Sequence, residues 1–140
     1  MRYFLFLFII ILSGKVYSQD LSGKWHVITY EDEIIYFNKA TDSITYKNVE
    51  RKKDAEDFKK MADFLILPIT YQFNNNKVTI NFHLMDEIYG NFVIDKLNQK
   101  IIFTDKDGKK DELPYSFENE VLFLEMEMES GFIKLGLKKN

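Results

Sequence analysis

Beyond residue 18 the sequence alternates apolar and polar residues with a period of two, and this alternation is the feature that most constrains the fold. In one clear example, Val78, Ile80 and Phe82 are separated by polar residues. The period is typical of strands with one buried and one solvated face, whereas an amphipathic helix repeats every three or four residues. Short turns join the last seven predicted strands, so we expect an antiparallel meander. The eight predicted strands span residues 24–30, 69–73, 78–84, 87–95, 100–104, 112–117, 121–128 and 132–138.

Two turn sequences indicate how neighbouring strands pair. Residues 74–77, Asn-Asn-Asn-Lys, have the composition of a tight hairpin turn. A two-residue turn at Ser130-Gly131 would place Glu127 opposite Lys134, and opposite charges at facing positions stabilise a strand pair. The same register gives the other face a continuous apolar surface, where Leu124, Met126 and Met128 meet Ile133, Leu135 and Leu137.

Residues 49–67 break the period of two. Their apolar residues recur at steps of three and four among charged residues, which predicts an amphipathic helix that Pro68 ends. Residues 31–47 predict a short extended pair around a turn at 40–43. The apolar stripe of the helix must be covered, and we expect it to lie on the sheet. The stripe consists of Ala55, Phe58, Met61, Ala62 and Leu65.

Eight strands are enough to close an up-and-down sheet into a barrel whose interior holds side chains or one small ligand. We therefore predict an all-β fold, an eight-stranded up-and-down antiparallel barrel. The amphipathic helix is inserted between its first and second strands. No internal repeat, low-complexity tract or linker divides residues 19–140, so we expect one domain there.

The first strand begins with Gly23-Lys24-Trp25. A Gly-x-Trp element followed by an antiparallel meander resembles the lipocalin (calycin) pattern, and more closely the small lipocalin-like domains of exported bacterial proteins. The resemblance covers nearly all of residues 19–140. It implies that Trp25 closes one end of the barrel beneath a basic residue of the last strand. Lys138 or Lys139 occupies the place where a lipocalin usually has Arg, and Gly23, Trp25 and Lys138 are then structural residues.

The direction of the first strand indicates which loops lie at the closed end of this barrel and which lie at its open mouth. Trp25 at the closed end places residues 31–67, including the helix, at the open mouth, where function usually lies. An apolar lining with one or two hydroxyl groups suits a lipid-like or aromatic ligand beneath a helical lid. The predicted ligand-binding residues are Phe58, Met61, Ile69, Tyr71, Leu84, Ile88, Leu113, Tyr115, Met128 and Ile133.

A second interpretation of the same residues stays open. Large side chains can fill a barrel of this size completely, and the helix would then only complete the core. The protein would be a structural or interaction module of the cell envelope without a small-molecule ligand. Phe123 and Phe132, predicted to face outward, would then belong to a surface that binds a protein partner.

Residues 1–18 have the pattern of a secretory signal peptide, with Arg2 followed by ten apolar residues and a cleavage site before Gln19. An apolar run of this length falls short of the roughly 20 residues of a membrane-spanning helix. An uncleaved anchor or a buried strand is the alternative. No cysteine is available for lipoprotein acylation, so we expect an exported protein, periplasmic or secreted. Loss of two basic residues leaves 17 basic and 22 acidic residues, a net charge of −5.

Composition excludes several kinds of chemistry. The absence of cysteine excludes thiol nucleophiles, iron–sulfur clusters and cysteine zinc sites. Acidic residues outnumber basic residues, so no positive field is available to hold a nucleic acid. His26 and His83 are the only imidazoles, and no catalytic motif accompanies them. We therefore expect no enzymatic activity, no cofactor and no metal. Glu125, Glu127 and Glu129 indicate a solvated row of charges facing lysines.

Overall fold

The computed structural model describes residues 20–140; the predicted signal peptide, residues 1–18, and its cleavage site before Gln19 lie outside the described residues. Within residues 20–140, ten strands form one antiparallel sheet in the order β10-β9-β8-β7-β6-β5-β4-β1-β2-β3. The strands are β1 (Gly23–Glu31), β2 (Ile35–Asn38), β3 (Ser43–Tyr46), β4 (Thr70–Asn74), β5 (Lys77–Asn81), β6 (Ile88–Asp95), β7 (Lys100–Asp105), β8 (Lys110–Glu118), β9 (Val121–Met128) and β10 (Gly131–Lys139).

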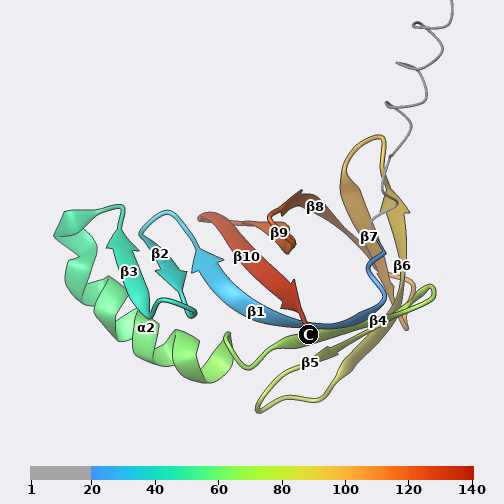
Figure 1. Ribbon diagram of the computed structural model, residues 1–140, viewed down its shortest axis with the longest axis horizontal. Helices are drawn as coiled ribbons and strands as arrows, with labels where there is room; N and C mark the ends of the chain where they lie inside the picture. Colours follow the sequence, from blue (N-terminus) through green and yellow to red (C-terminus); the bar gives the residue numbers. More distant parts are fainter. Residues whose placement is uncertain (1–19) are drawn as a thin grey trace, which may run out of the picture.

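Pairing of β10 with β1 closes eight of these strands, β1 and β4 to β10, into a barrel (Figure 1). Strands β4 to β10 each pair with the next strand in the chain, and β1 pairs with β4 across the helical segment. The predicted all-β fold is therefore confirmed: an eight-stranded antiparallel barrel with a helix between its first and second strands. Closure matters physically because it pairs most of the strand edges that an open sheet would leave free.

Strand β1 serves two partners along one edge. Residues Gly23–His26 pair with β4, whereas Thr29–Glu31 pair with β2. On the opposite edge, the register with β10 shifts between Val27 and Thr29, which leaves Ile28 as the extra residue of a bulge. A bulge bends its strand, and the β2–β3 hairpin extends the sheet from this bent half. The predicted short extended pair within residues 31–47 is confirmed.

The helical segment follows β3. A 3-10 turn, η1 (Val49–Arg51), leads into α2 (Lys52–Leu65), which confirms the helix predicted over residues 49–67. The helix buries Ala55 and Ala62, and Figure 1 shows it beside β2 and β3. Lys59 of the helix lies over the ring of Phe37 in β2, 5.2 Å from the ring centroid. Of the apolar stripe, Ala55 and Ala62 are buried and Phe58 packs against Tyr30 of β1, whereas Met61 and Leu65 are 45% and 41% exposed, so the stripe is covered only in part.

The β4–β5 hairpin has the predicted tight turn. Asn74 pairs with Lys77, so Asn75 and Asn76 form a two-residue turn. Asn75 has a φ of +53°, in the left-handed region that asparagine tolerates better than most residues. The composition of residues 74–77 was therefore a reliable signal.

The predicted register of the last hairpin is wrong by two residues. Lys134 pairs with Glu125 instead of Glu127, and the turn lies at residues 129–130. Gly131 opens β10 with a φ of +139°, and a Cβ atom on it would collide with the side chain of Glu33. A shift of two residues leaves every side chain on its own face of the sheet, so the hydrophobic pattern could not distinguish the two registers.

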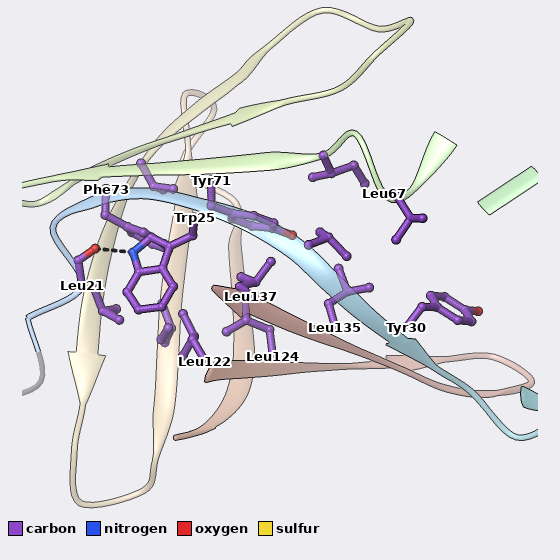
Figure 2. Packing of buried hydrophobic residues seen from close by; sticks show 14 of the residues in the cluster. Leu21, Trp25, Tyr30, Leu67, Tyr71, Phe73, Leu122, Leu124, Leu135 and Leu137 are labelled. Atoms are coloured by element: carbon purple, nitrogen blue, oxygen red, sulfur yellow. Dashed lines mark hydrogen bonds between the residues drawn. The ribbon is translucent and has the colours of Figure 1, made fainter. Parts of the chain in front are cut away.

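The core is closely packed where β1 begins. Trp25 is 4% exposed, and its indole Nε1 donates a hydrogen bond to the carbonyl of Leu21 over 2.7 Å (Figure 2). The ring of Phe117 packs edge-on against this indole, with 6.1 Å between centroids. Leu122 and Leu137 beside it are fully buried. These residues close one end of the barrel with side chains, as the resemblance implied for Trp25.

The basic residue above Trp25 is Lys139. Trp25 and Lys139 are register partners, and Lys139 Nζ lies 5.9 Å from the indole centroid. Lys138, the residue predicted for this place, pairs with His26 and is exposed. Neighbouring strand residues point to opposite faces, so only one of the two lysines can reach the barrel end. Gly23, with a φ of +114°, makes room for the Lys139 side chain, because a Cβ atom there would lie 2.6 Å from Lys139 Cε.

Candidate ligand-binding cavity

The other half of the barrel is hollow. A cavity of about 720 Å³ lies between β4 and β10, well inside the range of roughly 300–1,000 Å³ that small-molecule sites occupy. The barrel is therefore not packed solid. Apolar and aromatic side chains make up most of its wall, namely Ile69, Tyr71, Phe73, Val78, Ile80, Phe82, Ile88, Phe92, Ile101, Phe103, Leu113, Leu124, Met126 and Leu135.

Four of the ten predicted ligand-binding residues line this cavity: Ile69, Tyr71, Ile88 and Leu113. They come from β4, β6, β8 and the segment before β4, so the fold brings together residues from distant parts of the chain. The alternation also identifies the deeper wall residues, such as Phe73, Val78 and Ile101, which occupy the same inward positions further along their strands. Our prediction omitted these because it considered only the residues nearest the mouth.

The remaining six predicted residues do not line the cavity. Phe58 packs against Tyr30, with 4.9 Å between ring centroids, and Tyr115 packs edge-on against Phe117. Ile133 is half-buried against the core. Met61, Leu84 and Met128 lie outside the cavity wall and are 45%, 63% and 53% exposed.

Element boundaries explain these corrections. Leu84 lies beyond the end of β5 at Asn81, so the strand alternation no longer directs its side chain. Met128 is the last residue of β9, beyond Leu124 and Met126, which line the cavity from the same face. Met61 belongs to α2, which contributes no residue to the cavity wall. The helix is thus not a lid that lines the ligand space; it covers the hairpin beside the barrel.

A seam opens between β8 and β9 at the cavity. Only Tyr115–Glu118 of β8 pair with β9, although both strands continue toward the mouth. Residues Lys110–Pro114 pair with β7 alone, and residues Glu125–Met128 pair with β10 alone. All neighbouring strands of the barrel are therefore hydrogen-bonded at its closed end, whereas β8 and β9 are not paired along the hollow half. We call this gap in the pairing the seam.

Pro114 explains where the seam begins. The amide of Tyr115 donates to the carbonyl of Gln99, on the β7 side. Because successive backbone amides of a strand point to opposite sides, the nitrogen of residue 114 faces β9, and proline has no hydrogen to donate. The ladder ends at that residue. A proline within a strand pattern normally indicates an edge, and this is the sequence signal that could have revealed the seam.

Charged side chains lie along the seam. Lys100, Asp111, Glu112 and Glu127 contribute to the cavity wall. Lys100 Nζ and Glu112 Oε2 are 2.7 Å apart, and this hydrogen bond is the main cause of the raised pKa of Lys100, with further contributions from the charges of Glu112, Asp95 and Glu127. The Lys100 ammonium group thus interacts with the negative charges of three carboxylates, those of Glu112, Asp95 and Glu127.

Tyr71 contributes a hydroxyl group to the otherwise apolar part of the cavity wall. The side chain is 7% exposed, and no hydrogen bond to its hydroxyl is found among residues 20–140. The hydroxyl oxygen borders the cavity space and is not fully buried; among these residues only His26 Nε2 is a fully buried side-chain N or O atom without a partner. Burial alone raises the pKa of Tyr71 to about 12. In Figure 2 the ring lies between Trp25 and Leu135. A hydroxyl in this position can donate to or accept from a molecule that enters the cavity.

Other kinds of site are not evident in the part of the chain that the structure describes. Within residues 20–140, no group of three or more His, Asp or Glu side chains is arranged to hold a metal ion. No helix of this region is long and apolar enough to cross a membrane. His26 and His83 do not line the cavity.

The fold and the cavity together define a small closed β-barrel with a hollow half. No protein-family model matches the chain, and no curated protein matches it. Its structure is similar to the crystal structure of a DUF4847 family protein from Bacteroides vulgatus ATCC 8482, with a TM-score of 0.51 and 17% sequence identity over 85% of this chain and 93% of the other. At this identity the similarity supports the fold alone.

Proposed function

We propose that this protein binds a small hydrophobic ligand inside the hollow half of its barrel. The observation that carries the proposal is the cavity of about 720 Å³, whose wall is mostly apolar and aromatic. Its volume and composition match those of small-molecule sites in other proteins. The role is binding and not catalysis. In this proposal the chain is exported after cleavage before Gln19 and belongs with the lipocalin-like proteins that its Gly-x-Trp element resembles.

The test is to fill the cavity without disturbing the rest of the barrel. Ile88 of β6 lines the cavity and is 38% exposed, so Ile88→Trp can add volume at low cost to folding. Val93 lies on the same strand, outside the cavity and 63% exposed, so Val93→Trp is the matched control. Binding of an environment-sensitive apolar dye to residues 19–140 reports on both variants.

We expect Ile88→Trp to weaken dye binding at least tenfold, which corresponds to about 1.4 kcal/mol, and Val93→Trp to leave it unchanged. Both variants should retain the melting temperature of the parent within a few degrees. Failure of the parent to bind any apolar probe, or equal binding by the two variants, would contradict the proposal.

A second candidate function is docking of another protein at the mouth. Exposed apolar side chains gather on α2 and on the β5–β6 connection, where Phe64 packs edge-on against His83 at 5.1 Å. Leu84 and Met85 of the same connection and Tyr89 at the start of β6 are also exposed. The outward aromatics Phe123 and Phe132 favour docking less, because Lys134 and Lys47 lie over their rings. Cross-linking in envelope extracts, with Leu84→Ser and Met85→Ser as variants, tests this candidate.

A further inference from the structure

We propose that the cavity takes amphipathic molecules whose polar end is a cationic amine, and that this end lies at the seam between β8 and β9. The inference rests on the proposed function and specifies the class of ligand. It combines three independent features of the molecule: the unpartnered hydroxyl inside the cavity, the parted ladder beside it, and the sign of the charges along the opening.

The Tyr71 hydroxyl indicates that an occupant belongs in this space. A hydroxyl that borders an apolar cavity gains free energy when a molecule in that cavity forms a hydrogen bond with it. The Tyr71 side chain is more than nine-tenths buried and lines the cavity, and no hydrogen bond to its hydroxyl is found among residues 20–140. The hydroxyl oxygen keeps some contact with the cavity space, because within these residues His26 Nε2 is the one side-chain N or O atom that is both fully buried and without a partner. A ligand that places a hydrogen-bonding atom beside this hydroxyl satisfies it, while the surrounding aromatic and aliphatic wall covers the apolar body of the ligand.

The seam provides a polar exit from this apolar space. β8 and β9 pair only over Tyr115–Glu118, on the side of Pro114 toward the closed end. Where the two strands are not paired, residues on the outer face of the sheet reach the cavity. Lys100, Glu112 and Glu127 line the cavity for this reason, although they lie at positions that alternate with inward residues such as Ile101, Leu113 and Met126. An amphipathic molecule can thus keep its apolar part inside and its charged group at the seam, in water.

The charges at the seam select the sign of that group. The charged residues of the cavity wall are one lysine and three acids, Asp111, Glu112 and Glu127, a net charge of −2. Lys100 is already bound to Glu112, and the contact of Asp111 with Lys109 is a long 3.9 Å between exposed groups, which contributes little. Two carboxylates therefore remain to attract a cation and to repel the carboxylate of a fatty acid.

Three ligands with one chain length and different head groups test the inference: dodecylamine, dodecanol and dodecanoate, each below its critical micelle concentration. Displacement of a neutral apolar dye from residues 19–140 at low salt measures their affinities. We expect the amine to bind about tenfold more tightly than the acid, as two unneutralised charges near a protein surface imply, with the alcohol between them. Raising the salt concentration should narrow this ratio.

Charge variants locate the effect. Glu127→Gln and Asp111→Asn should each lower the amine-to-acid ratio about threefold, whereas Lys100→Gln should raise it. Glu118→Gln is the matched control, because Glu118 is an exposed residue of β8 at the closed end of the barrel. All four side chains are solvent-accessible, so these variants should fold.

The outcomes separate this inference from the proposed function. Equal or tighter binding of dodecanoate would overturn the preference for amines while leaving a hydrophobic binding protein. A preference for the amine that Glu127→Gln, Asp111→Asn and Lys100→Gln all leave unchanged would overturn the placement of the head group at the seam. Binding of none of the three ligands would overturn the proposed function itself.

Discussion

The two ends of the barrel are built from the same strands and the same alternation, yet one is solid and the other hollow. At the closed end Trp25 crosses the interior and contacts Phe117, and Leu122 and Leu137 are fully buried. At the mouth end the inward side chains leave about 720 Å³ between them. Trp25 of β1 fills the closed end, whereas no residue of β1 or of α2 lines the hollow half.

The ladders differ in the same way. At the closed end β8 pairs with β9 through Tyr115–Glu118, whereas past Pro114 the two strands part. Strand pairing and interior packing are therefore both complete at one end and both incomplete at the other. The comparison indicates that the closed end supplies stability and that the hollow end is available for binding.

The largest expected effect comes from one substitution made on each side of this boundary. Leu122 and Leu124 lie two residues apart on the inner face of β9 and are both buried, but only Leu124 lines the cavity. We expect Leu122→Ala to cost about 3–5 kcal/mol of unfolding free energy, because it creates a new void in a packed region. Leu124→Ala enlarges an existing space and should cost about 2–3 kcal/mol. This is close to the free energy of transferring the removed methyl groups to water, without a further cost for a new cavity.

Urea denaturation followed by circular dichroism measures both losses. Equal losses for the two leucine variants would show that the hollow end is packed as closely as the closed end, and the comparison would fail.

The next effect concerns pH. The pKa of Tyr71 is raised to about 12 by burial, so the folded protein holds this proton more tightly than the unfolded chain does. The resulting stability is fully present below pH 10 and is lost as the pH rises from 10 to 12, by roughly 2–3 kcal/mol. Tyr71→Phe should remove this part of the alkaline loss. The raised pKa of Tyr30 remains in both proteins, so the difference between their stability curves isolates Tyr71. Identical dependence of unfolding free energy on pH above pH 10 for the parent and Tyr71→Phe would contradict this prediction.

The smallest effect on stability, and the sharpest test of the seam, is Pro114→Ala. A new amide at position 114 faces β9 and can extend the ladder. The gained hydrogen bond, about 0.5–1.5 kcal/mol, offsets the freedom returned to the unfolded chain, about 0.4–1 kcal/mol, so stability should change by less than about 1 kcal/mol. Hydrogen exchange should show protection of the new amide and of Glu125–Met128, together with slower ligand association.

Pro68→Ala is the matched control for the seam, since Pro68 precedes β4 and lies outside the cavity wall. Rapid exchange of the new amide at position 114 would show that something other than the missing donor parts β8 from β9.

Much of the fold followed from local patterns. The alternation predicted all eight barrel strands, and the three- and four-residue steps of Ala55, Phe58 and Ala62 predicted the helix. The turn at residues 74–77 was evident from its composition. The position of the helix was not predictable, because an apolar stripe requires a covering surface without specifying which one. Here the helix lies beside the β2–β3 hairpin and packs Phe58 against Tyr30 of β1.

The candidate site was predicted only in part. Ile69, Tyr71, Ile88 and Leu113 follow from alternation within well-formed strands. Leu84 and Met128 lie outside the cavity wall because Leu84 follows the end of β5 and Met128 is the last residue of β9, beyond the cavity-lining residues of the same face. Lys139 rather than Lys138 reaches Trp25 because neighbouring strand residues face opposite ways, and the sequence offered both lysines without a register to choose between them.

By itself, the sequence determined which face of each strand is buried, because that property repeats every two residues along a single segment. Only the tertiary structure decided how much space the buried faces leave and where the ladder opens. Cavity volume depends on side chains from seven strands that meet across the barrel, and the seam depends on which neighbour the Pro114 nitrogen faces. These are relations between residues far apart in the chain, and no local period contains them.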